Sequence, residues 1–138
     1  MKLLIDTNVY LDLLLKREGH ETCRELFYIC AKKRNQTFVT SMSLRDIEYV
    51  LHKYIHNSQI SRKMQHWVYE ITTKVISISS DAAIGALFEE TNDYEDNLQM
   101  LAAQEAMLDA IITKDKKHFK ECKIPVFTPE EICKLLKQ

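Results

Sequence analysis

The chain has 138 residues, of which 46% are hydrophobic and 28% charged, with only two glycines and two prolines. This composition is typical of a helix-rich globular protein, excludes a disordered chain, and leaves no apolar run long enough to cross a bilayer. The formal net charge of -1 does not by itself indicate a nucleic-acid binder, although clustered acids could offset a basic rim. We therefore expect one domain over residues 1–138, large enough to bury a core without metal or disulfide support.

Four cysteines are present without a CxxC pair or the spacing of a zinc site: Cys23, Cys30, Cys122 and Cys133. We expect most of them to be small core residues in a reducing environment. The N-terminus has neither the basic region nor the long apolar segment of a secretion signal. These features predict a cytoplasmic protein with no membrane segment.

Short apolar runs along the chain predict strands, and apolar side chains at helical spacing predict helices between them. The predicted strands cover residues 3–5, 36–40, 74–79, 110–113 and 123–127. The predicted helices cover residues 9–15, about 20–34, 43–55, about 58–73, a short stretch after Ser80, 92–107 and 128–136. Thr128, Pro129 and Glu131 have the pattern of a capped helix start. This alternation predicts a mostly parallel sheet with helices on both faces, that is, a three-layer α/β/α sandwich.

Acidic residues follow the strands or open the helices of this predicted sheet. Asp6 and Asp115 come directly after strands, and Asp46, Asp93 and Asp96 lie in the first turns of helices. In a parallel α/β fold all of these positions meet at the carboxyl edge of the sheet, where ligands bind. Carboxylates gathered this closely repel one another unless a cation joins them, and oxygen ligands favour Mg²⁺ or Mn²⁺. The sequence therefore predicts a metal site at this edge.

Helix capping is the simpler explanation for some of these acids. Asp6 could cap the helix that follows it, and Ser43 with Asp46, or Asp93 with Asp96, could form N-cap and N3 pairs. Glu48 is a rival to Asp46, but it lies two residues further along the helix and faces elsewhere. Convergence of four or five acids on one edge is harder to explain by capping alone.

Basic residues accompany the acids: Lys114, Lys116, Lys117, His118 and Lys120 near Asp115, and Arg45 beside Asp46. They are expected to form a positive rim that holds an anionic chain, although a solvated charge run is an equally simple explanation for any one lysine. His52 and His56 lack a third metal ligand nearby and are expected at the surface. Tyr49, Trp67, Tyr69 and Tyr94 could stack on bases, with packing the better explanation for Trp67.

Four segments, in chain order, resemble the acidic motifs of the PIN domain: LLIDTNVYLDLL, SLRDIEYVL, DYEDNLQMLAA and IITKDKKHF. The resemblance covers nearly the whole chain. It implies a five-stranded parallel α/β/α sandwich and metal-dependent ribonuclease activity with Mg²⁺ or Mn²⁺. Small single-domain bacterial members are often toxins of the virulence-associated protein C type, so the resemblance also implies an RNA substrate, an antitoxin partner and a homodimer.

The same resemblance assigns roles to individual residues. Asp6, Asp96 and Asp115 match the first, third and fourth acids of the family and would be the metal ligands. The second acid is usually a glutamate, and the matching residue here is Asp46, whose side chain is shorter. The four acids expected to carry catalysis are thus Asp6, Asp46, Asp96 and Asp115. Asp93 matches an additional acid of a subgroup, and Thr113 matches a hydroxyl near the last acid.

Two other functions are compatible with parts of this pattern. A phosphoryl-transfer domain of the receiver or haloacid dehalogenase type also places acids at strand ends. Here, however, the first strand ends in Asp-Thr-Asn rather than Asp-x-Asp, and no aspartate ends the third strand. A catalytically inactive PIN-like module that binds RNA or a protein is the second possibility, favoured only by the aspartate at position 46.

Overall fold

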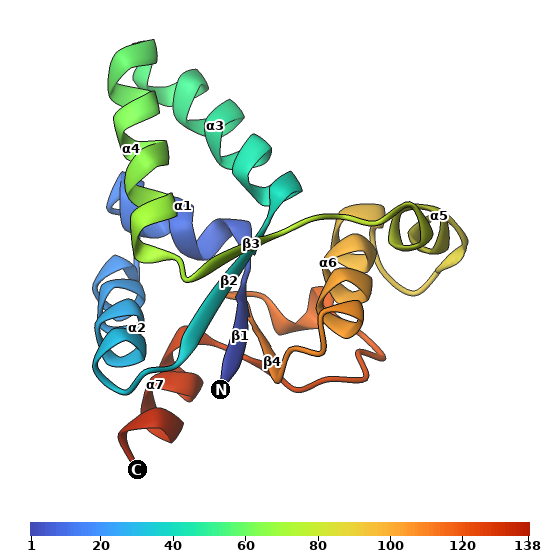
Figure 1. Cartoon of the computed structure of the whole chain (residues 1–138). Helices are drawn as coiled ribbons and strands as arrows, with labels where there is room; N and C mark the ends of the chain where they lie inside the picture. Colours follow the sequence, from blue (N-terminus) through green and yellow to red (C-terminus); the bar gives the residue numbers. More distant parts are fainter.

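The computed structural model describes all 138 residues and contains one five-stranded sheet, with strand order β3-β2-β1-β4-β5 (Figure 1). Every neighbouring pair of strands is parallel. The strands are β1 (Lys2–Ile5), β2 (Gln36–Thr40), β3 (Lys74–Ile76), β4 (Ala110–Ile112) and β5 (Val126–Phe127). The helices are α1 (Thr7–Leu15), α2 (His20–Lys32), α3 (Ser41–Ile55), α4 (Ser58–Ile71), α5 (Ser80–Phe88), α6 (Tyr94–Glu105), α7 (Pro129–Lys137) and the 3-10 helix η1 (Lys116–His118).

Helices cover both faces of the sheet, which confirms the predicted three-layer α/β/α sandwich. Side chains of β1 alternate between the faces: Leu3 and Ile5 join a core cluster of 19 buried residues, and Leu4 joins a second cluster of seven. The larger cluster packs α1, α2, α3, α4 and α7 against one face. The smaller one packs α6 against the other face, and α5 packs on α6 (Figure 1).

The strand order creates a switch point beside β1. From β1 the chain builds the sheet in one direction through β2 and β3, and it then returns to add β4 and β5 on the other side of β1. Leu4 in β1 is in register with Phe38 of β2 and Ile111 of β4. A switch point of this kind, at the carboxyl ends of the strands, is where parallel α/β folds bind ligands. Asp6 and Asp115 follow these two strands.

Several predicted boundaries and one predicted cap are wrong. Strand β3 ends at Ile76 rather than at residue 79, and Ser79 instead caps α5 by accepting a hydrogen bond from the Ala82 backbone N–H at 2.9 Å. Helix α3 begins at Ser41, with Thr40 as the N-cap that accepts from the Ser43 N–H at 3.0 Å. The predicted Ser43 to Asp46 cap is therefore absent. At α7 the predicted capping box of Thr128 and Glu131 is confirmed.

The cysteines and the helix lengths agree with the sequence-based expectations. All four cysteines are free, and all except Cys122 are buried. None of the helices is both long and apolar enough to cross a membrane.

The loop between α5 and α6 is held by a buried amide. Asn97 is fully buried, and its Nδ2 donates to the carbonyl oxygens of Glu89 at 2.7 Å and of Asn92 at 3.0 Å. These bonds fold the segment back over the start of α6, where Asp93 and Asp96 lie. The local fold at this end of the sheet therefore depends on one side chain.

We predict that Asn97→Ala lowers the free energy of unfolding by about 1–3 kcal/mol, because it leaves the part-buried carbonyl groups of Glu89 and Asn92 without this donor. Urea unfolding measures this directly. Gln104→Ala, on the same helix at a side chain without hydrogen bonds, is the matched control and should change stability by less than about 0.5 kcal/mol. Equal losses in the two variants would contradict the role given to Asn97.

Candidate active site

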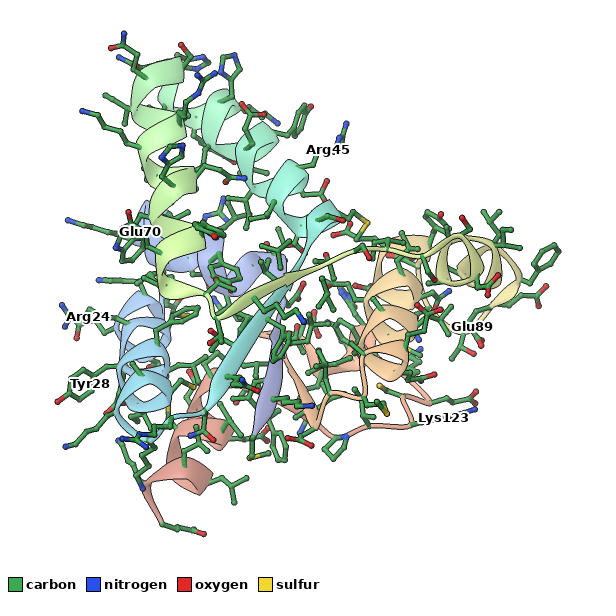
Figure 2. The ribbon with its side chains drawn as sticks, viewed as in Figure 1. Arg24, Tyr28, Arg45, Glu70, Glu89 and Lys123 are labelled. Carbon is green, nitrogen blue, oxygen red and sulfur yellow. The ribbon has the colours of Figure 1, made fainter.

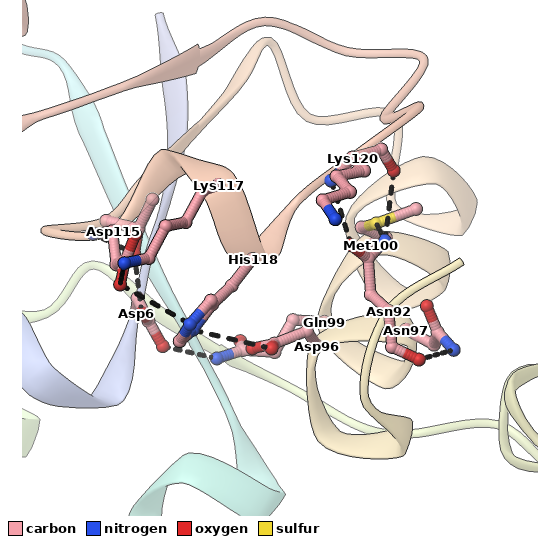
Figure 3. Close-up of polar contacts among 11 residues, drawn as sticks. Asp6, Asn92, Asp96, Asn97, Gln99, Met100, Asp115, Lys117, His118 and Lys120 are labelled. Carbon is pink, nitrogen blue, oxygen red and sulfur yellow. Dashed lines mark hydrogen bonds and ion pairs between the residues drawn. The ribbon is translucent and has the colours of Figure 1, made fainter. Parts of the chain in front are cut away.

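Asp6 is the most deeply placed acid of the site. It occupies the N-cap position of α1, but its side chain makes no capping bond. Instead Oδ1 accepts from Gln99 Nε2 of α6, and Oδ2 accepts from Thr113 Oγ1, each at 2.8 Å (Figure 3). The residue is only 8% exposed, and burial raises the pKa of Asp6 above its ordinary value. The capping explanation is thus wrong for this side chain, which is held at the switch point by two other elements.

Asp96 is the electrostatic centre of the site. It lies in the first turn of α6, one turn before Gln99. Partial burial and the charge of Asp6 raise the pKa of Asp96 to about 6, and His118 opposes this rise. The charges of Asp93 and Asp115 raise it further. Four of the five predicted acids are therefore close enough to act on one another.

Asp115 and His118 close the site from the side of β4. Asp115 follows β4 at the start of η1, and its backbone N–H donates to Thr113 Oγ1 at 3.2 Å. His118 lies between two carboxylates, with Nε2 at 3.4 Å from Asp115 Oδ2 and Nδ1 at 3.9 Å from Asp96 Oδ2 (Figure 3). Lys117 Nζ is 3.6 Å from the same Asp115 oxygen. Cationic groups thus occupy the space beside Asp115.

A wholly polar cavity of about 330 Å³ adjoins these acids. Asp93 and Asp96 line it from the start of α6, and Lys117, His118 and Lys120 line it from η1 and the loop beyond. Asn92 fixes the two sides to each other, because its side chain donates to the Lys120 carbonyl and accepts from the Lys120 N–H, both at 2.9 Å (Figure 3). Asp93 is the N-cap residue of α6 but makes no capping bond, so its carboxylate remains available to the cavity.

Asp46 lies further from this centre than the other acids. Helix α3 is anchored beside α1 by a hydrogen bond from Thr7 Oγ1 to Ser43 Oγ at 2.9 Å. Asp46 Oδ1 then lies 3.3 Å from the guanidinium of its neighbour Arg45. Its charge acts on Glu95 of α6: loss of hydration raises the pKa of Glu95, and the charges of Asp46 and Asp6 contribute to the rise.

Sequence reasoning missed Glu95 and Gln99. Both lie on α6 between or just after the predicted acids, and Gln99 follows Glu95 by four residues and Asp96 by three, which places the three on one face of the helix. This spacing could have indicated from the sequence that Gln99 lies beside the acids of the site. Gln99 is fully buried, and its Oε1 has no hydrogen-bond partner in the chain, so this amide is oriented by its single bond to Asp6.

The predicted basic rim is only partly present. Lys114 forms an ion pair with the buried Asp12 of α1 and donates to the Glu18 carbonyl at 3.1 Å, so it points away from the acids. Lys116 pairs with Glu131 of α7 at 3.0 Å. Lys117, His118 and Lys120 do face the acidic cavity. Glu48 is exposed on the side of α3 that meets α4, which agrees with its expected orientation away from the site.

The side chains gathered at this site are of the kind that binds a hard divalent cation, but they are not yet positioned around a single ion. All of the gathered anionic groups are carboxylates, and burial is the main cause of the raised pKa values of Asp6 and Asp96, with the charge of Asp6 adding to that of Asp96. No three Asp, Glu, His or Cys side chains are already positioned to hold one ion among them. A cation would compete with Lys117 and His118 for Asp115.

Together these observations define a three-layer parallel α/β domain with an acidic site at the switch point of its sheet. The chain belongs to the PIN domain family, whose sequence profile matches residues 2–117. No curated protein sequence matches the chain.

Solved structures of toxin proteins share the fold. VapBC2 from Rickettsia felis bound to a DNA fragment from its promoter has a TM-score of 0.71 and 17% identity, covering 93% of this chain and 98% of that one. A toxin–antitoxin complex from Klebsiella pneumoniae has a TM-score of 0.64 and 23% identity, with coverages of 92% and 97%. A sarcin–ricin loop cleaving VapC toxin from Mycobacterium tuberculosis has a TM-score of 0.66 and 13% identity, with coverages of 83% and 90%. At these identities the shared property is the fold.

We predict that the metal-free protein becomes less stable relative to Asp96→Asn as the pH rises from about 4 to about 6. The pKa of Asp96 rises from 3.8 to about 6 on folding, so the folded state binds more protons than the unfolded state in this window. The free energy of unfolding must then fall with rising pH, by on the order of 1–2 kcal/mol from this residue. Asp96→Asn removes that dependence.

Urea unfolding in a chelator between pH 3.5 and 7.5 measures the difference between the two proteins. Asp81→Asn, at an exposed acid in the first turn of α5, is the control and should leave the wild-type pH dependence in place. Parallel stability curves for wild type and Asp96→Asn would rule out the proposed charge repulsion.

Proposed function

We propose that this protein is a metal-dependent endoribonuclease that hydrolyses RNA phosphodiester bonds with Mg²⁺ or Mn²⁺. The observation that carries the proposal is the gathering of Asp6, Asp93 and Asp115 around Asp96, close enough for their charges to raise its pKa, at the switch point of the sheet. Maintaining such repulsion lowers stability, so a fold that keeps it gains most when a divalent cation binds there. PIN domains are typically nucleases, which agrees with this chemistry.

The proposed ligands are Asp6, Asp96 and Asp115, with Asp46 as the fourth catalytic acid. Bound Mg²⁺ or Mn²⁺ would supply an activated water and neutralise the charge that develops on the phosphodiester. Gln99 and Thr113 orient the Asp6 carboxylate by their hydrogen bonds at 2.8 Å. Lys117 and Lys120, on the wall of the polar cavity, would bind phosphate oxygens of the RNA next to the acids.

We further propose that the protein is the toxin of a bacterial toxin–antitoxin pair, with an antitoxin partner and a homodimeric state. Support comes from the fold shared with the VapC toxin of Mycobacterium tuberculosis and with the Klebsiella pneumoniae complex, together with the PIN family membership. A catalytically inactive module that binds RNA or a protein is the alternative. The lack of three preformed ligands and the pairing of Asp46 with Arg45 are the observations that favour it.

We predict that the wild-type protein binds Mn²⁺ at sub-millimolar concentration and that Asp96→Asn weakens this binding by at least about tenfold. Asp6→Asn should reduce metal-dependent RNA cleavage by on the order of a hundredfold or more, because an electrostatic clamp of this kind is a large catalytic term. Calorimetry and a gel assay of labelled RNA measure the two effects. Asp81→Asn should behave as wild type in both. Wild-type protein without metal binding at millimolar concentration would instead support the inactive module.

The fourth acid can be identified with three single substitutions. We predict that Asp46→Asn lowers the cleavage rate by about tenfold or more, since it removes charge from the edge of the site. Glu48→Gln, an isosteric change on the far side of the same helix, should leave the rate within about twofold of wild type. A silent Asp46→Asn together with an inactive Glu95→Gln would transfer the role to Glu95, whose pKa is raised by Asp46 and Asp6.

A further inference from the structure

The hairpin of α3 and α4 has an unusual charge distribution. No aspartate or glutamate lies between Glu48 and Glu70, although the chain has 20 acidic residues. The same segment contains Lys53, Arg62 and Lys63 and three of the five histidines, His52, His56 and His66. A chain with a formal net charge of -1 thus carries a positive hairpin.

The cations of this hairpin are not used by the fold. Lys53, Arg62 and Lys63 are all exposed, and none of them forms an ion pair. By contrast, Lys114 and Lys116 on either side of Asp115 are both bound to carboxylates. The hairpin itself is fixed, because Gln65 of α4 donates to the Leu44 carbonyl of α3 and the two helices pack along their length. The two helices that carry these unpaired cations are therefore fixed relative to each other.

Helical spacing gathers part of this charge on one face of α3. The face opposite the buried Ile47 and Leu51 carries Arg45, Tyr49, His52, Lys53 and His56, all exposed. We call these five residues the α3 track. Figure 2 shows Arg45 on the side of α3 away from α4. The track starts beside Asp46 and runs for most of a 15-residue helix, about 22 Å long, that projects past the sheet (Figure 1).

We propose that the α3 track binds the RNA strand that flanks the scissile phosphodiester, an inference that rests on the proposed nuclease function and names where its substrate is held. Phosphates would lie along Arg45 and Lys53, and a base would stack on Tyr49, whose side chain is 62% exposed. The unpaired cation of Lys53 and the exposed ring of Tyr49, on a helix that begins at the acidic edge, match a polyanion better than they match a protein surface. The acids themselves repel RNA, so binding energy must come from outside them.

The test is RNA binding without chemistry. Fluorescence anisotropy in a chelator, with single-stranded RNAs of mixed sequence about 20 and about 5 nucleotides long, measures affinity at several salt concentrations. Lys53→Gln should reduce the slope of log affinity against log salt by about 0.7, the value for one lost phosphate contact on a single strand. The matched control is Lys74→Gln at the opposite edge of the sheet, where an exposed lysine also lacks an ion pair.

Stacking is tested at Tyr49. Tyr49→Ala should weaken binding of the long RNA by about tenfold, and Tyr49→Phe should restore most of it because the ring is kept. The short RNA should be much less affected by either change. Arg45 is left unchanged because it contacts Asp46.

The outcomes separate this proposal from the nuclease assignment. Track-dependent RNA binding in a protein that never cleaves RNA would support the track and refute the nuclease. Cleavage and RNA affinity that are both insensitive to Lys53 and Tyr49 would overturn the track and leave the nuclease standing, with an acidic protein as the alternative partner of this face. Wild-type protein that binds no RNA in the chelator would also overturn the track.

Discussion

The buried carboxylate of Asp6 is the interaction on which the site depends. Because β1 is the central strand, the residue that follows it cannot reach bulk water easily, and its charge must be met by the elements around it. Gln99 of α6 and Thr113 beyond β4 meet it with one hydrogen bond each. These bonds fix α6 against the sheet edge and so set the positions of Asp96 and Glu95. The fold and the acidic site are therefore held by the same contacts.

Charge repulsion at this edge is compensated only in part. Thr113 and Gln99 are neutral donors, and of the lysines beside the site only Lys117 pairs with one of its acids, Asp115. Lys114, which directly precedes Asp115 in the sequence, instead forms an ion pair with the buried Asp12. Burial and, after it, the charge of Asp6 raise the pKa of Asp96 to about 6. A bound cation would favour the charged carboxylate, which supports the proposed metal site at this edge.

Much of this arrangement could be predicted from sequence, since strand and helix order alone fixes which acids share an edge in a parallel sheet. The fold and the proximity of Asp6, Asp96 and Asp115 follow from that rule, and the structure confirms them. Hydrogen-bond partners could not be predicted, because they depend on side-chain direction and not on position along the chain. Thr40 rather than Ser43 caps α3, and Lys114 turns back to α1 because an unpaired Asp12 would be costly inside the core.

Several cations near the acidic site are in ion pairs, whereas those in the middle of the α3–α4 hairpin are not. Near the acidic site three cations form ion pairs with carboxylates: Lys117 with Asp115, Lys116 with Glu131 and Arg45 with Asp46. Lys120, which lines the cavity, is the lysine at this edge that is not in an ion pair. Lys53, Arg62 and Lys63 lie on the α3–α4 hairpin that begins at the same edge, in a stretch without acids between Glu48 and Glu70, and none of them is in an ion pair. An RNA that reached the site by that face would approach through favourable potential and meet the repulsive acids only at the phosphate that a bound cation neutralises.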